Sequence, residues 1–263
     1  MLLAEFDPTC TAIINPQREE TEGTLPKIVV SCFSRQTFDR MAARLNARPV
    51  SVVSFACADL PLMRGEYEGV ELGLALAPTG APACVSLFES VFTMGAETVI
   101  LFGTCGVLDG TISDCSVIIP TSALRDEGTS FHYAPASDEI EVNPRYTALF
   151  ARILDQRGAR YTMGKTWSTD GFFRETRAKT EKRREAGCVC VDMECSAMAA
   201  LAAFRKKEVF QFFYAADNLA AEEWDRRSLA NDAKLDEKDR IALLACELAR
   251  AISLEKQAEN PAF

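Results

Sequence analysis

The amino-acid sequence predicts an α/β protein with a largely parallel or mixed central sheet. Short apolar runs rich in β-formers alternate along the chain with segments whose apolar residues recur every three to four positions. The run 98–102, Thr-Val-Ile-Leu-Phe, is almost wholly apolar, which is typical of a strand covered by helices on both faces of a sheet. No internal repeat, low-complexity tract or Pro/Gly/Ser-rich linker interrupts the alternation. We therefore expect one domain over residues 1–263.

The expected strands are the apolar, β-rich runs between turn residues. The first of them, 27–33, carries Ile-Val-Val before a small cysteine, which suits a buried position. In chain order the strands are expected at 27–33, 49–57, 70–77, 98–102, 116–119, 160–168, 188–191 and 209–215.

The expected helices are the segments with a helical apolar period. Gly95 follows the second of them and suits a helix C-terminus, where a positive φ is common. The helices, with the aligned apolar residues where one face is evident, are 36–45 (Phe38, Met41, Ala42, Leu45), 82–94 (Val85, Phe88, Val91, Phe92), 144–157, 176–185, 194–204 and 236–254 (Ile241, Leu244, Leu248, Ile252).

Composition limits the classes of function. The chain has 29 Lys and Arg against 38 Asp and Glu, a net charge of −9, and 48% hydrophobic residues. This balance excludes disorder as the main state and argues against a nucleic-acid or anionic-membrane partner, because phosphate-rich partners are bound mostly by Lys and Arg. No apolar run reaches the roughly 18–20 residues of a membrane span, and residues 1–7 do not resemble a signal peptide.

Cysteine usage indicates a reduced, cytoplasmic protein without a metal. The ten cysteines lie mostly in apolar runs, as buried thiols do. There is no C-x-x-C pair, and the single histidine is remote in sequence from Cys188, Cys190 and Cys195. We therefore expect no structural zinc site.

A glycine-rich segment directly follows the strand at 98–102. Gly103, Thr104, Cys105 and Gly106 are expected to form a tight turn that presents N–H groups and a hydroxyl to a ligand. Ligands of such sheets collect beyond the carboxyl ends of the strands. A plain strand-exit turn without a ligand is the alternative.

Two carboxylates lie where the strand at 188–191 meets the next helix. Asp192 and Glu194 could accept hydrogen bonds from neighbouring sugar hydroxyls, and the small apolar residues 196–203 indicate a helix packed on the sheet that would hold them rigidly. Each also has a structural alternative. Asp192 could cap the helix, and Glu194 could complement the helix dipole.

Further candidates follow two other strands. Asp217 comes just after the apolar run 210–214, where burial would raise its pKa and suit it to donate a proton. A turn aspartate is the alternative. His132 lies in the polar segment 125–133, and a histidine held by local hydrogen bonds is the alternative there. The nucleophile motif G-x-S-x-G is absent.

Together, the order and spacing of these segments resemble the nucleoside phosphorylase superfamily of purine nucleoside and uridine phosphorylases, which also includes adenosylhomocysteine-type nucleosidases. The resemblance covers about 27–254, the expected core. It rests on 101–106, on 122–135, which is most similar to the uridine branch, on 168–173, and on 191–194, where Asp192 replaces a family glutamate. It implies a mixed, partly barrel-like central sheet flanked by helices, assembled as a homo-oligomer (dimer, trimer or hexamer).

The resemblance also implies an activity. Family members cleave the N-glycosidic bond of a ribonucleoside, with inorganic phosphate as co-substrate and no metal or organic cofactor, to give the free base and ribose 1-phosphate. The matched residues take the family's roles: Gly103 and Thr104 at phosphate or ribose, Phe172 stacked on the base, Met193 under the sugar, Asp192 and Glu194 in the ribose motif, and Asp217 as the acid that protonates a purine at N7.

Departures from the family pattern keep two questions open. Family members bind phosphate with three arginines, and Arg35 is the one residue here that corresponds to any of them. The position of another of these arginines is occupied by Leu101. Arg125 or Arg174 is a candidate substitute. The uracil-reading Gln-x-Arg pair is replaced by residues 174–177, Arg-Glu-Thr-Arg. A nucleosidase that uses water, and a non-catalytic nucleoside-binding protein, are therefore alternatives. The segment 122–135, with Arg125 and His132, favours uridine, whereas Asp217 favours purines.

Overall fold

The computed structural model describes residues 5–17 and 23–259 and contains a ten-stranded sheet. The expectation about the start of the chain concerns residues 1–7, of which 1–4 lie outside the described part. Within the described part, no helix is both long and apolar enough to cross a membrane. In chain order the elements are β1 (Ile28–Cys32), α1 (Arg35–Arg44), β2 (Arg48–Phe55), β3 (Ala58–Tyr67), β4 (Val70–Leu76), α2 (Ala81–Thr93), β5 (Thr98–Val107), β6 (Val117–Asp126), β7 (Glu139–Glu141), α3 (Thr147–Gln156), β8 (Tyr161–Thr169), α4 (Arg177–Glu185), β9 (Cys188–Asp192), α5 (Cys195–Arg205), β10 (Glu208–Asn218) and α6 (Leu235–Glu259), with 3-10 turns at Thr129–His132 and Phe172–Arg174.

Five strands of the sheet close into a ring. β5 pairs with β10 in parallel and with β9 antiparallel, and β9, β8, β6 and β10 complete the circle. Beyond β5 the sheet continues as an open extension through β1, β4, β3 and β2. The mixed, partly barrel-like sheet that the family resemblance implies is thus confirmed.

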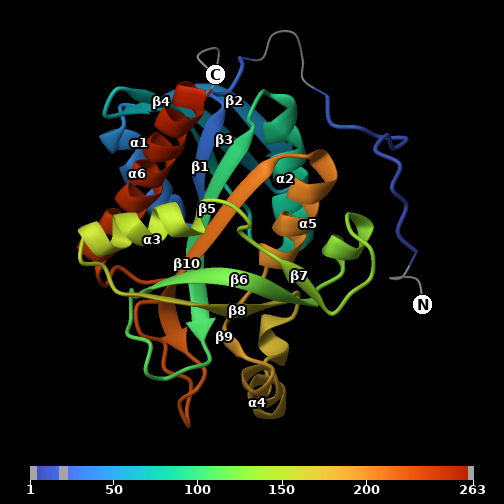
Figure 1. Cartoon of the computed structure of the whole chain (residues 1–263), viewed down its shortest axis with the longest axis vertical. Helices are drawn as coiled ribbons and strands as arrows, with labels where there is room; N and C mark the ends of the chain where they lie inside the picture. The colour runs from blue at the N-terminus through green and yellow to red at the C-terminus, as the bar shows by residue number, and fades with distance from the viewer. Residues whose placement is uncertain (1–4, 18–22, 260–263) are drawn as a thin grey trace.

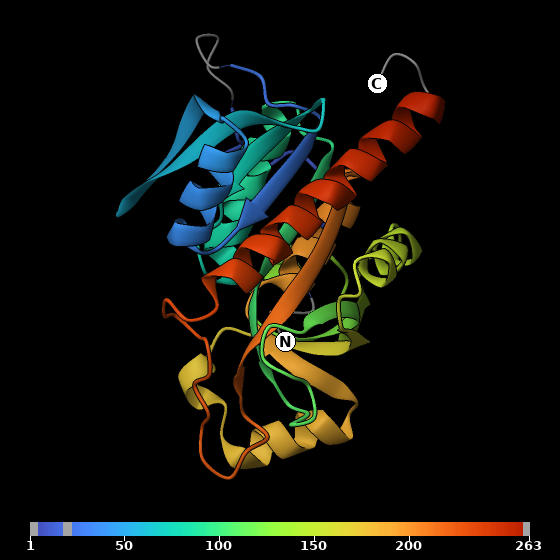
Figure 2. The same ribbon diagram turned by 90° about the vertical axis from the view of Figure 1, so that its left-hand side faces the viewer.

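Helices cover both sides of the sheet. α1, α3 and α6 lie together on one side and α2 and α5 on the other, and α4 lies at the far end beneath the closed part of the sheet (Figures 1 and 2). The main core fills the space between β1, β4, β5 and β10 and these helices. It includes the stacked rings of Phe102 and Phe212, whose centroids are 5.5 Å apart. This frame fixes the carboxyl ends of β1, β5 and β10 relative to one another.

The strand through the glycine-rich segment is longer than expected. β5 does not turn after Phe102 but continues to Val107, so Gly103 and Gly106 are strand residues. A Cβ on Gly103 would come within 2.6 Å of the Phe33 ring, and one on Gly106 within 2.3 Å of Leu219 Cδ1. The glycines serve close approach of neighbouring side chains rather than a tight turn.

Two strands were not expected from the sequence, and one extends further. β3 contains Pro61 and Gly65 and lies between β4 and the edge strand β2, with which it forms an antiparallel hairpin. Pro61 precedes the residues that pair with β4, which begin at Leu62, so its missing N–H removes no bond on that side. β7 has only three residues. β6 runs on to Asp126, so Arg125 lies in a strand and not in the polar loop expected for it.

Candidate active site

A cavity of about 780 Å³ opens at the carboxyl ends of the strands. It lies where β5, β9 and β10 end, beside the turn after β8 and the loop 219–230 that follows β10. The side chains discussed below are among its lining residues, which are Phe33, Thr79, Thr104, Cys105, Gly106, Phe172, Phe173, Glu175, Arg177, Thr180, Val191, Asp192, Met193, Glu194, Asp217, Leu219, Ala221, Trp224, Arg226, Leu229 and Ala230.

Glu194 is a buried carboxyl group at the start of α5. Its Oε1 accepts a hydrogen bond of 2.6 Å from the backbone N–H of Gly80, the residue before α2. Gly80 has φ +97°, a conformation that side chains rarely adopt, so a glycine here allows the N–H to point at the carboxyl. Burial, together with the negative charge of Asp192, raises the pKa of Glu194 to about 8.

Asp192 holds this corner of the cavity in place. One of its oxygens accepts hydrogen bonds from Thr166 and Ser168 of β8, and the other accepts the backbone N–H groups of Glu194 and Cys195. Burial raises its pKa although these four hydrogen bonds oppose the shift. Asp192 therefore fixes β8, β9 and the first turn of α5 to one another, close to the capping role that the sequence offered as an alternative.

Asp217 is the last residue but one of β10, on the other side of the cavity. The pairing of β10 with β5 shifts between Ala215 and Asp217, an irregularity of the kind that re-aims side chains beside binding sites. Trp224 Nε1 donates a 2.8 Å hydrogen bond to Asp217 Oδ2. Burial raises the pKa of Asp217, while the indole N–H and the charge of Arg227 act in the opposite direction.

Glu175 is a second acid on the same wall. Its carboxyl group has no hydrogen-bond or ion-pair partner among the described residues, and its pKa is raised to about 7 by burial and by the charge of Asp217. Neither the carboxylate pattern nor the helical period pointed to it, because it lies in a charged stretch that is typical of a solvated surface.

Both arginines that line the cavity are engaged with backbone carbonyls. Arg177 donates to the carbonyl oxygens of Leu219, Ala221 and Glu222, at 3.2, 2.8 and 2.6 Å. Arg226 donates to the carbonyls of Leu229 and Ala230, both at 3.3 Å. These guanidinium groups hold the loop 219–230 in shape.

The remaining lining residues give a hydroxyl and an apolar wall. Thr104 is the one exposed residue of the otherwise buried strand β5, and its side chain borders the cavity. Met193 lies between the two acids at the end of β9, and Phe172 and Phe173 pack on each other with ring centroids 3.9 Å apart. The aromatic pair and Trp224 are largely exposed at the cavity mouth, which suits them to cover a flat ligand.

Of the candidate site residues, the structure brings together Thr104, Phe172, Asp192, Met193, Glu194 and Asp217. Gly103 does not line the cavity itself but lies against the ring of Phe33, which does. Arg35, Arg125, His132 and Arg174 do not line the cavity either. Arg35 begins α1 and lies 3.8 Å from Asp39, and His132 ends a 3-10 turn. Arg125 is buried elsewhere, and its guanidinium donates to Ser130, Ser137 and the carbonyl of Pro135.

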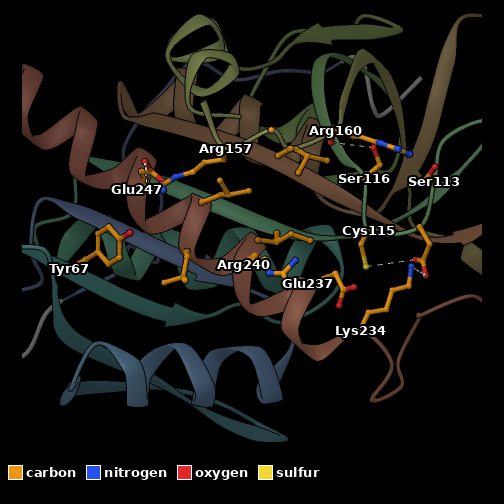
Figure 3. A pocket seen from close by; sticks show the side chains of 17 residues that line it. Tyr67, Ser113, Cys115, Ser116, Arg157, Arg160, Lys234, Glu237, Arg240 and Glu247 are labelled. Atoms are coloured by element: carbon orange, nitrogen blue, oxygen red, sulfur yellow. Dashed lines mark hydrogen bonds and ion pairs between the residues drawn. The ribbon is translucent and has the colours of Figure 1, made fainter. Parts of the chain in front are cut away.

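A second hollow, of about 660 Å³, lies between α6 and the turn from α3 to β8 (Figure 3). Two of its charged pairs are already formed, Arg157 with Glu247 and Lys234 with Asp114. None of the candidate site residues named from the sequence lines it. Over the described ranges, no three His, Cys, Asp or Glu side chains gather in a way that could hold a metal ion.

Comparison with known proteins agrees with this fold. Residues 27–252 match the phosphorylase superfamily, so the chain belongs to that superfamily. A guanosine phosphorylase of Halorubrum lacusprofundi is 27% identical over 54% of this chain, and a uridine phosphorylase of Thermococcus kodakarensis is 33% identical over 41%. The aligned part spans only 58% and 39% of those relatives' own lengths.

Solved structures show the same fold. A uridine phosphorylase from Vibrio fischeri superposes with a TM-score of 0.75 at 18% identity, covering 89% of this chain and all of that one. A purine nucleoside phosphorylase from Toxoplasma gondii, solved with immucillin-H, gives 0.76 at 16% identity, covering 92% of this chain and 99% of that one.

Proposed function

We propose that the protein is a cytoplasmic nucleoside phosphorylase that cleaves the N-glycosidic bond of a ribonucleoside with inorganic phosphate. The observation that carries the proposal is that two acids with raised pKa values, the buried Glu194 and Asp217, line the same cavity near the ends of β9 and β10. The names of the relatives support the same reaction class. The proposed assembly is a homo-oligomer.

The two acids have different tasks in the proposed reaction. As a carboxylate, Glu194 accepts hydrogen bonds from the ribose hydroxyls and favours the positive charge that develops on the sugar. Asp217 delivers a proton to the base. A phosphate oxygen forms the new bond to C1′ while the C1′–N bond breaks. The electron pair of the C1′–N bond passes to the base, which leaves as the neutral free base carrying the proton from Asp217. Ribose 1-phosphate is the other product.

Other lining residues position the substrates in this proposal. Thr104 offers its hydroxyl to phosphate or to the ribose, Met193 packs under the sugar, and Phe172 covers the base. Asp192 acts as a positioning residue for Glu194, since its own oxygens are taken up by four donors.

Hydrolysis by water is the second candidate reaction, and a specific observation favours it. Leu101 is fully buried in the core, and the two cavity arginines already spend part of their N–H donors on backbone carbonyls, so no described lining residue offers a wholly unengaged guanidinium to phosphate. Losing bidentate guanidinium contacts weakens phosphate binding.

The test is product release from uridine, inosine, adenosine and guanosine, each with and without phosphate. We expect release only with phosphate, giving ribose 1-phosphate. Phosphate-independent release of free ribose would make the protein a nucleosidase. Tight nucleoside binding with no turnover in either condition would leave a binding protein. The variant Glu194→Gln keeps the shape of the side chain and is expected to lose at least tenfold in turnover.

A further inference from the structure

We propose that Glu175 reads the base and that, with Asp217, it selects an aminopurine nucleoside, such as guanosine or adenosine, over uridine. The inference rests on the proposed function, whose base it specifies. It follows from which polar groups of the cavity wall are free and which are already occupied.

The hydrogen-bond donors around the base region are partly engaged. Trp224 Nε1 donates to Asp217, and Arg177 and Arg226 donate to carbonyl groups of the loop 219–230. The indole N–H is therefore taken up by Asp217, and each guanidinium, which has five N–H groups, keeps only part of them for a ligand.

The acceptors, in contrast, are free. Glu175 has no side-chain partner among the described residues although it is half-buried in the wall, and one oxygen of Asp217 has no hydrogen-bond donor among them. A half-buried carboxyl group without a partner is costly, and a ligand that supplies N–H donors would remove that cost.

Uracil and the purines differ in how they meet such a wall. Uracil presents two carbonyl oxygens with one N–H between them, so contact with Glu175 would bring carbonyl oxygens against carboxyl oxygens. An aminopurine presents exocyclic N–H groups that a carboxylate accepts, and its N7 takes a proton from Asp217. Glu175 and Asp217 both line the one cavity, so a ligand that fills it meets both acids.

The experiment compares the intact protein with Glu175→Gln, which keeps the side-chain shape but adds an amide donor. The matched control is Glu223→Gln, on the loop beside the cavity and outside its lining. The readouts are kcat/KM for guanosine, adenosine and uridine and, independently of activity, the affinity for guanine, adenine and uracil by calorimetry.

The expected results are a preference of the unaltered protein for aminopurines over uridine by at least tenfold, and a loss of about tenfold or more for aminopurines in Glu175→Gln, with uridine and uracil unchanged or improved. Glu223→Gln should match the unaltered protein. A preference for uridine, or the same base ratio in Glu175→Gln, would overturn the inference while leaving the proposed function intact. If no nucleoside is turned over, but the protein prefers guanine and Glu175→Gln removes that preference, the proposed function would be overturned and the inference about Glu175 would stand.

Discussion

Replacing Glu194 with glutamine is expected to change how the stability of the protein depends on pH. Burial raises the pKa of Glu194 to about 8 in the folded protein, against an ordinary value of 4.5. The folded state therefore holds this proton more tightly than the unfolded state does. The stabilisation is fully present below the unfolded pKa and is lost as the pH rises through the folded pKa.

The size of the effect follows from the shift. A difference of 8 − 4.5 = 3.5 pKa units corresponds to about 5 kcal/mol over the whole range, and to about 3–4 kcal/mol between pH 5 and pH 8. Glutamine cannot ionise, and its oxygen still accepts the Gly80 N–H, so Glu194→Gln lacks this loss. The variant should match the unaltered protein near pH 5 and exceed it in stability by a few kcal/mol at pH 8.

The assay is equilibrium urea unfolding at pH 5, 6, 7 and 8 at one protein concentration, followed by the fluorescence of the fully buried Trp167. The difference between the two proteins isolates Glu194 and its coupling to Asp192, since the other acids are present in both. Glu223→Gln is the control and should follow the unaltered protein at every pH. Parallel stability curves for Glu194→Gln and the unaltered protein would refute the reasoning.

Three further substitutions test the cavity. Asp217→Asn should lower kcat for purine nucleosides by about 10²–10⁴-fold and for uridine much less, and equal losses in steady-state assays would reduce Asp217 to a structural residue. Arg177→Ala should release the carbonyls of the loop after β10, raising KM and hastening its cleavage in limited proteolysis; an unchanged cleavage pattern would contradict the clamp. Gly103→Ala should raise KM several-fold, because its Cβ would lie 2.6 Å from the Phe33 ring. Gly110→Ala, with its nearest contact at 3.8 Å, should not change KM.

The sequence was sufficient for the order of the described helices, for most strands and for part of the site. Apolar periodicity located β1, β10, the start of β5 and the six described helices to within about five residues, because each buries one face or both. The acids Glu194 and Asp217 were singled out from their places at strand ends, and both line the cavity. The place of a residue in the strand–helix pattern is enough to predict that it lies at a strand end, where ligands of such sheets bind.

Other features depend on contacts between distant segments. Glu175 lies in a charged stretch, and only the placement of the turn after β8 at the cavity wall makes its carboxyl group half-buried and unpartnered among the described residues. Arg125 reads as a polar loop residue, yet it is buried and bound to Ser130 and to carbonyls of the following loop. The long β5 was missed because Gly103 was taken as a turn residue, whereas its neighbour Phe33 needs the space.

The acidity of the cavity and its proposed anionic co-substrate are compatible because of burial. Glu175, Asp192, Glu194 and Asp217 all line the same space, and burial raises the pKa of each. The cavity therefore holds fewer negative charges near neutral pH than four ionised carboxylates would give, and it repels phosphate correspondingly less. In the proposed reaction, the ribose hydroxyls favour the ionised form of Glu194, whose charge beside the sugar stabilises the developing cation, and the N–H donors of the base favour the ionised form of Glu175. A cavity with fewer ionised acids needs fewer arginines to bind phosphate than one whose acids are all ionised. Leucine in place of an arginine at position 101 is therefore compatible with the proposed phosphorolysis.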